Sequence, residues 1–162
     1  MTDEDYMRMA IEEARRAEEL DEVPIGAVVV YEPAPRRPLA EPQVIARACN
    51  LRETTQDPAG HAEFIALKQA AERLGVWRLT GCTVYVTLEP CSMCAGLIVH
   101  SRVSRVVYGA LEPKAGIVQS QGQFFTQGFL NHRVLFEGGV LADECGAILS
   151  DFFKARRAKQ PL

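Results

Sequence analysis

The spacing of apolar residues divides the chain into helices and strands. Between Thr2 and about Leu20, apolar side chains recur every three or four positions, which predicts an amphipathic helix. Thr2 followed by Asp5 resembles a capping box at the start of that helix. Shorter apolar or β-branched runs predict strands over 25–31, 43–48, 82–87, 102–108 and 133–137, and further helices over 62–74, 92–100 and 143–158.

Glycine and proline mark the boundaries between these elements. Gly75 and Gly109 are expected to end the helix and the strand that precede them. The segment 32–42 holds four prolines and is predicted to be a loop, and 112–131 is rich in Gly and Gln and is predicted to be irregular. The alternation of strands and helices predicts a single α/β domain over 1–162, with one mixed sheet between two layers of helices.

Composition is that of a soluble globular domain. The chain has 162 residues, of which 48% are hydrophobic and 24% are charged. No apolar run approaches the ~18 residues that cross a bilayer, so no membrane association is expected. The N-terminus is acidic and then amphipathic, unlike a signal peptide, which predicts a cytoplasmic protein.

Charge is unevenly distributed along the chain. The net charge of −3 argues against broad, non-specific nucleic-acid binding. The last segment, 151–162, nevertheless carries Lys154, Arg156, Arg157 and Lys159 against one acidic residue. A local basic surface therefore remains possible in a chain that is acidic overall.

Five cysteines, an odd number, argue against a disulfide framework. Cys91 and Cys94 form a C-x-x-C pair after a predicted strand and at the start of a predicted helix. That pattern fits a redox pair, half of a closed structural zinc site, or ligands of a working metal ion.

His61 and Glu63 favour the third interpretation. His61 stands at the start of another predicted helix, and helix N-termini favour thiolates and nearby anions. One imidazole and two thiolates would leave one position of a tetrahedral zinc ion open for water. Glu63 could then carry protons to and from that water. A redox pair gives His61 and Glu63 no role, and a closed site lacks a fourth ligand at ligand spacing.

The sequences His61-Ala62-Glu63 and Pro90-Cys91-Ser92-Met93-Cys94 resemble the H-x-E and P-C-x-x-C signature of zinc-dependent nucleobase deaminases. The resemblance extends along nearly the whole chain to the bacterial tRNA adenosine deaminases, within the cytidine deaminase superfamily. It is carried by 22–28, 85–102, 131–133 and 141–153. It implies a cytidine-deaminase-like, three-layer α-β-α sandwich around a mixed five-stranded sheet. It also implies a homodimer with one Zn²⁺ per subunit, acting on a tRNA anticodon stem-loop.

The implied reaction converts adenosine to inosine at the wobble position of the anticodon. Zinc hydroxide attacks C6, Glu63 shuttles the protons, and ammonia leaves. His61, Cys91 and Cys94 are the implied metal ligands. The residues expected to bind substrate are Asn50, Ala62, Pro90, His132, Phe152, Phe153, Arg156 and Arg157.

Several of these residues also have purely structural interpretations. Asn50 is compatible with a turn, His132 with the start of a strand, and the two phenylalanines with a helix that packs on the core. Likewise, 95–99 is either a dimer face or core.

Two segments depart from the family pattern, and two alternative functions share part of the same motif. The proline-rich 32–42 is longer than the usual hairpin, and 114–120 is bulkier than the small-residue stretch usual there. A deaminase of free guanine, cytosine or a nucleotide would share the whole metal site. A zinc-stabilised or redox binding module would leave Glu63 without a function.

Overall fold

The computed structural model describes residues 1–33 and 41–159. Its elements are α1 (Asp3–Glu19), β1 (Gly26–Tyr31), β2 (Gln43–Cys49), α2 (Arg52–Thr55), α3 (Ala62–Leu74), β3 (Cys82–Leu88), α4 (Ser92–His100), β4 (Arg105–Ala110), the 3₁₀ helix η1 (Phe124–Thr126), β5 (Leu135–Glu137) and α5 (Ala142–Lys159). Among the described helices, none has the length and apolar character that crossing a membrane requires.

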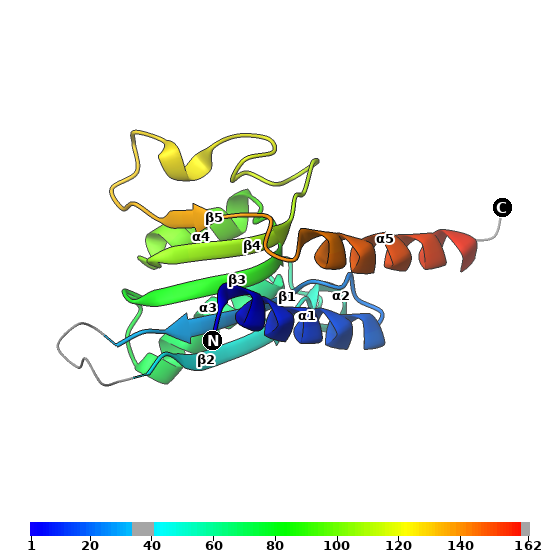
Figure 1. Cartoon of the computed structure of the whole chain (residues 1–162), viewed down its shortest axis with the longest axis horizontal. Coiled ribbons are helices and arrows are strands. Elements are labelled where there is room, and N and C mark those ends of the chain that lie inside the picture. The colour runs from blue at the N-terminus through cyan, green and yellow to red at the C-terminus, as the bar shows by residue number, and fades with distance from the viewer. Residues whose placement is uncertain (34–40, 160–162) are drawn as a thin grey trace.

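The five strands form one mixed sheet in the order β2-β1-β3-β4-β5 (Figure 1). Strand β1 pairs antiparallel with β2 and with β3, whereas β3–β4 and β4–β5 are parallel. Apolar side chains of α3 and α4 pack on one face of the sheet, and those of α1 and α5 pack on the other. The predicted three-layer α-β-α sandwich is therefore confirmed.

Helix boundaries follow the local sequence signals. The hydroxyl of Thr2 accepts a hydrogen bond from the backbone N–H of Asp5, whose carboxylate in turn accepts one from the N–H of Thr2, so the capping box is present. Helix α3 has the predicted bounds and ends at Gly75, which adopts φ +71°. In α4, Ala95, Ile98 and Val99 belong to the core, while both ends of the helix are exposed.

The prediction for β4 was wrong at both ends. The strand begins at Arg105 because Arg102 adopts φ +64° in the preceding turn. Gly109 lies inside the strand instead of ending it. A Cβ at this position would lie 2.5 Å from Sγ of Cys145 and 2.8 Å from the carbonyl oxygen of Thr87. The glycine is therefore required by the close approach of α5 and not by a turn.

One further segment differs from the sequence interpretation. The short helix α2 was not predicted, because its four residues carry no apolar period. Within the predicted loop 32–42, residues 34–40 lie outside the part of the chain that the structure describes. The remaining irregular region, 112–131, contains only the three-residue η1 as a regular element.

Candidate active site

The candidate metal ligands come from the starts of two helices. His61 is the N-cap of α3 and Cys91 is the N-cap of α4, but neither side chain caps its own helix. They turn toward each other instead: Nδ1 of His61 lies 3.6 Å from Sγ of Cys91 and 3.5 Å from Sγ of Cys94. The three ligand atoms all lie within 4.8 Å of one another. The sequence prediction that these residues converge is thus met by the geometry.

The spacing of these atoms fits a tetrahedral zinc ion. Zinc bonds of about 2.3 Å to sulfur and about 2.05 Å to nitrogen, at a tetrahedral angle, separate the two ligand atoms by about 3.6 Å. The observed separations of 3.5 and 3.6 Å agree with that value. Two sulfurs and an imidazole are also the donor set that suits zinc best. Within the described part of the chain this trio is the one cluster with metal-ligand spacing, which leaves a fourth coordination position open.

The three side chains of the trio affect one another's protonation. A hydrogen bond from Cys94, together with the imidazole of His61, lowers the pKa of Cys91 to about 3. Its hydrogen bond with Cys91 raises the pKa of His61. The pKa of Cys94 is raised because its proton is shared with the Cys91 thiolate. Two sulfurs therefore share a proton that a divalent metal ion would displace.

Glu63 lies in the first turn of α3, two residues after His61, and only 4% of it is exposed. Burial raises the pKa of its carboxyl group. It faces a cavity of about 210 Å³, smaller than the sites that hold drug-sized ligands. The cavity is lined by Val23, Ile25, Asn50, Arg52, His61, Glu63, Leu88, Glu89, Cys91, Glu112 and Ala115.

Asn50 lines this cavity, but its amide group already has backbone partners. Its Nδ2 donates to the carbonyl oxygen of Val23 at 3.2 Å, and its Oδ1 accepts from the N–H of Arg52 at 3.2 Å. An amide has two N–H groups and two lone pairs, so one donor and one acceptor site remain for a ligand. The predicted role in base binding and the structural role are compatible.

Three other residues predicted to bind substrate do not line this cavity. Ala62 is fully buried behind His61. The carbonyl oxygen of Pro90 accepts a hydrogen bond from the N–H of Ile117 at 3.0 Å. One ring nitrogen of His132, Nε2, lies 2.7 Å from the carbonyl oxygen of Val103, and this residue does not line the cavity.

The predicted aromatic and basic residues of α5 lie away from the metal ligands and divide into two pairs. Phe152 is buried, and the guanidinium of Arg156 stacks over its ring with 4.7 Å between guanidinium carbon and ring centroid. Arg156 also donates to the carbonyl oxygen of Asp21 at 3.1 Å and pairs with its carboxylate at 3.4 Å. Phe153 and Arg157 are exposed.

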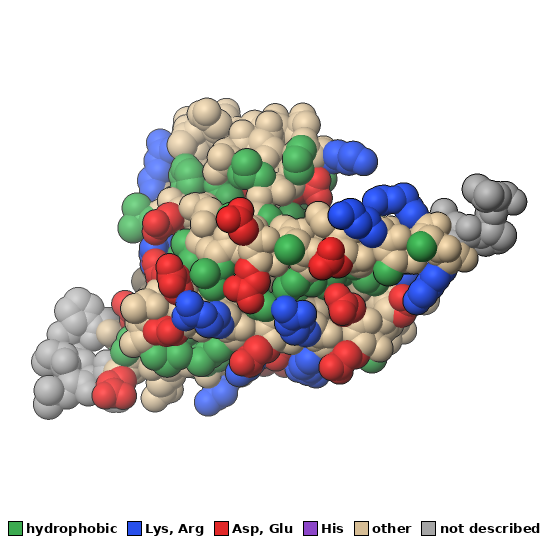
Figure 2. All heavy atoms as spheres, turned by 45° about the vertical axis from the view of Figure 1, so that its right-hand side comes forward, with side chains coloured by type: hydrophobic (Ala, Val, Ile, Leu, Met, Phe, Trp, Pro, Cys, Tyr) green, Lys and Arg blue, Asp and Glu red, His purple; other side chains and the backbone are tan. Residues whose placement is uncertain are grey.

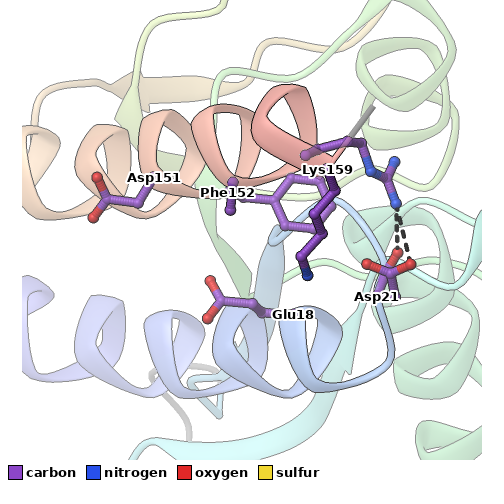
Figure 3. A pocket seen from close by; sticks show the side chains of 7 residues that line it. Glu18, Asp21, Asp151, Phe152 and Lys159 are labelled. Carbon is purple, nitrogen blue, oxygen red and sulfur yellow. Dashed lines mark hydrogen bonds and ion pairs between the residues drawn. The ribbon is translucent and has the colours of Figure 1, made fainter. Parts of the chain in front are cut away.

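A second cavity of about 580 Å³ lies between the end of α1 and α5 (Figure 3). Figure 3 shows Phe152 pointing from α5 toward α1, with Glu18 and Asp151 beside it. Figure 2 shows Lys and Arg side chains over the C-terminal part of α5, and acidic and basic side chains mixed over α1. The basic residues Arg156, Arg157 and Lys159 therefore lie in the last turn of α5.

Sequence reasoning missed four residues around the site. Arg52 and Glu112 line the cavity. Glu22 and Glu89 are buried acids, 2% exposed each. The carboxylate of Glu22 accepts hydrogen bonds from the backbone N–H groups of Glu53 and Thr54 and so holds α2 in place. An acidic residue directly after an apolar strand, as Glu89 is, was the available signal.

Comparisons with known proteins also indicate a deaminase. The family model of the MafB19-like deaminases matches residues 1–157. The tRNA-specific adenosine deaminase of Bacillus subtilis is 48% identical over 158 residues, which is 98% of this chain and 92% of that protein. A solved structure from work on A-to-I editing by tRNA:A34 deaminases at the wobble position is 42% identical, with a TM-score of 0.81 over 90% of this chain and 99% of that one.

A guanine deaminase from Bacillus subtilis offers a contrast. It shares the fold with a TM-score of 0.61, over 100% of this chain and 98% of that chain, but is only 26% identical. The chain is thus almost twice as similar in sequence to the tRNA deaminase of that organism as to its guanine deaminase. With His61, Glu63 and Cys91 of the two motifs at one cavity, these similarities show that the chain belongs to the family of tRNA-specific adenosine deaminases.

Proposed function

We propose that the chain is a zinc-dependent hydrolase, a single deaminase domain over 1–162, that converts adenosine to inosine at the wobble position of tRNA anticodons. The observation that carries the proposal is the placement of buried Glu63 beside the His61, Cys91 and Cys94 trio at a small cavity. An open coordination position next to a buried carboxylate suits hydrolysis, and neither a redox pair nor a closed structural site needs such a carboxylate.

His61, Cys91 and Cys94 would hold the zinc, which when bound supplies a Lewis acid that lowers the pKa of a water molecule in the open position. Glu63 accepts a proton from that water and delivers it to N1 of adenine, a transfer for which a raised pKa is suited. A C–O bond forms at C6, and the C6–N bond then breaks. Glu63 then takes the remaining proton from the oxygen at C6 and gives it to the departing amine, so that C6 becomes a carbonyl, water is consumed and ammonia leaves.

The size of the cavity supports a substrate that enters as one splayed base. The anticodon loop presents unpaired bases, so little pairing energy is lost when one of them turns into the enzyme. The free donor and acceptor of Asn50 would pair with the base edge, with Ala62 and Pro90 as backbone neighbours. Arg52 at the cavity rim would contact a phosphate.

Phe153 and Arg157 supply an exposed aromatic and a cation at the basic end of α5, where flanking RNA would bind. Phe152 and Arg156 would support that surface from behind, and His132 would support the segment that precedes β5. The substrate is thus proposed to contact both the cavity and the exposed face of α5.

A homodimer remains part of the proposal. Trp77 is 59% exposed beside an apolar cavity of about 240 Å³. The cavity is lined by Leu67, Lys68, Ala71, Trp77, Leu79, Leu97, His100 and Ser101, mostly from α3 and α4. A second copy of the chain would cover this surface. Light scattering of wild type and Trp77→Glu would test this: a dimer that becomes monomeric supports the assignment. A cytoplasmic location fits a tRNA substrate and the free thiols of the described cysteines.

Nucleoside mass spectrometry tests the proposed function. The purified protein is incubated with an anticodon stem-loop that carries adenosine at the wobble position, and with free guanine and free cytosine in parallel. Inosine formed in the RNA alone supports the proposal. Deamination of a free base with unchanged RNA would keep the zinc chemistry and assign the chain to the free-base alternative.

A further inference from the structure

The carboxylate of Glu89 lies directly before the Pro90–Cys94 segment and is 2% exposed. One oxygen, Oε2, accepts hydrogen bonds from the N–H groups of Val118, Gln119 and Ser120, at 3.1, 2.8 and 2.9 Å. The other, Oε1, accepts from the N–H of Glu112 at 3.0 Å and from the hydroxyl of Ser120. Five donors from one nine-residue segment therefore converge on one buried side chain.

The segment 112–120 needs such a partner because it forms no helix or strand of its own. Backbone N–H groups without a partner are costly inside a protein, and here a single carboxylate accepts four of them. The donors in turn offset the cost of burying the charge. Glu89 thus accepts hydrogen bonds from the backbone of this segment, as a neighbouring strand would in a sheet.

Gly116 allows the segment to approach this closely. A Cβ at this position would lie 2.4 Å from Cδ and from Oε1 of Glu89, and 2.6 Å from the carbonyl oxygen of Glu112. Gly116 also forms an isolated bridge with Cys91, and the N–H of Ile117 donates to the carbonyl oxygen of Pro90. The segment is therefore attached along the chain that carries a metal ligand.

The attached segment forms part of the candidate active site. Glu112 and Ala115 line the same cavity as His61, Glu63 and Asn50. We propose that Glu89 is a positioning residue that holds 112–120 as a wall of the substrate cavity, and that Gly116 is the point at which the two must stay in contact. The proposal rests on the proposed function for its kinetic test, but not for its structural test.

The role predicts a specific pattern of effects. Loss of the Glu89 carboxylate would release 112–120 from its place beside the cavity. The three candidate metal ligands and Glu63 would keep their places on α3 and α4. Substrate binding should therefore weaken while zinc binding and the chemical step persist. A residue that served stability alone would change the unfolding midpoint and leave KM unchanged well below that midpoint.

The test compares Glu89→Gln and Gly116→Ala with the wild type. Gln keeps the shape of Glu89 but loses the charge and turns one acceptor into a donor. Gly128→Ala is the matched control, since a Cβ there meets nothing within 4 Å. Ser120→Ala, which removes only the hydroxyl donor, is a milder variant that reports even where the others fail to fold.

Three quantities are measured: hydrogen exchange of the 112–120 amides, zinc per chain, and kcat and KM with the anticodon stem-loop. Both anchor variants should speed exchange of these amides and raise KM, each ~10-fold or more, because hydrogen bonds to a charged group are lost. Zinc should stay at the wild-type level and kcat should change less than ~3-fold. The double variant should be no worse than either single one, and Ser120→Ala should show a smaller change of the same kind.

Unchanged hydrogen exchange of the 112–120 amides in Glu89→Gln would contradict the positioning role of Glu89. A fall in kcat and in zinc per chain at unchanged KM would contradict it as well. Exchange and zinc are measured without RNA. If the wild type deaminated no RNA, the proposed function would fail while faster exchange at 112–120 would still support the anchor.

Discussion

His61, at the start of α3, and Cys94, in the first turn of α4, hold their ligand atoms 3.5 Å apart although they are 33 positions apart in the chain. The contact joins two elements on the same face of the sheet. A metal ion at this place would therefore link α3 to α4 as well as serve the reaction.

Removal of the metal should lower stability. A ligand that binds only the folded state, at a free concentration of about 100 times its Kd, adds about 2.7 kcal/mol to the free energy of unfolding. For a domain of this length, losing it lowers the melting temperature by ~5 to 11 °C. Calorimetry before and after chelation measures this, and added Zn²⁺ should restore the midpoint. Cys94→Ser should show the low midpoint with or without zinc, whereas Cys49→Ala, outside the trio, should respond like the wild type. An unchanged midpoint after complete zinc removal would contradict the link.

Glu63→Gln should retain zinc and lose turnover. The amide keeps the size of the buried side chain but cannot accept and return a proton, so kcat should fall by ~10²- to 10⁴-fold. Inosine formation and zinc content are measured on the same preparation. Glu19→Gln, an exposed residue of α1, is the control and should keep full activity. Turnover close to wild type in Glu63→Gln would remove the carboxylate from the mechanism.

Asp3 should make stability depend on pH. Arg105 donates to both oxygens of its carboxylate, at 2.9 and 2.7 Å, and Tyr85 donates at 2.7 Å. The hydrogen bonds from Arg105 lower the pKa of Asp3 despite partial burial. Because the folded-state pKa is the lower one, this stabilisation is present above the unfolded value of about 3.9 and is lost as pH falls through the folded value.

Asp3→Asn should therefore be less stable than wild type by about 1 to 2 kcal/mol at pH 7, since the pair is partly exposed to solvent. The difference should shrink below pH 4. Urea unfolding of both proteins at several pH values measures it, and the comparison cancels acid effects on the metal site. Glu41→Gln, an exposed residue, is the control. A gap that widened toward acid would refute the assigned sign.

The two residue pairs of α5 should separate binding from stability. Arg157→Ala should weaken stem-loop binding, with a smaller salt dependence by about one unit of slope, and leave the unfolding free energy unchanged. Phe152→Ala should cost about 3 kcal/mol of stability because it leaves a cavity under α5. Binding titrations at several salt concentrations, with chemical unfolding alongside, measure both. Loss of RNA binding in Phe152→Ala with intact stability would reverse the assignment.

Sequence patterns predicted the elements whose signals are local. Apolar spacing and Gly75 defined α3, and the Thr2–Asp5 pair defined the start of α1. The convergence of His61, Cys91 and Cys94 was predictable because a short motif fixes residue type and spacing together. These features depend on neighbours a few positions away in the chain.

Features that depend on distant neighbours were not predictable. Gly109 resembles a strand terminator until α5 is placed beside it, and β4 begins three residues later than predicted because Arg102 turns the chain first. Glu89 resembles an ordinary acid until 112–120 is folded over it. Which face of α5 packs on the sheet is likewise decided by tertiary contacts. The spacing of Ile148 and Phe152 was compatible with the core, but it did not exclude substrate binding by Phe152.

The position of β3 has a consequence for the order in which the proposed metal ligands would come together. Strand β3 lies between His61 and Cys91 in sequence and occupies the centre of the sheet. The two cysteines are three positions apart in the chain, whereas we expect the imidazole to reach them once pairing of β3 with β1 has brought α3 and α4 to one face of the sheet. During refolding with cobalt in place of zinc, the absorption spectrum would change when the nitrogen ligand binds. The time of that change would therefore report when the central strands of the sheet have paired.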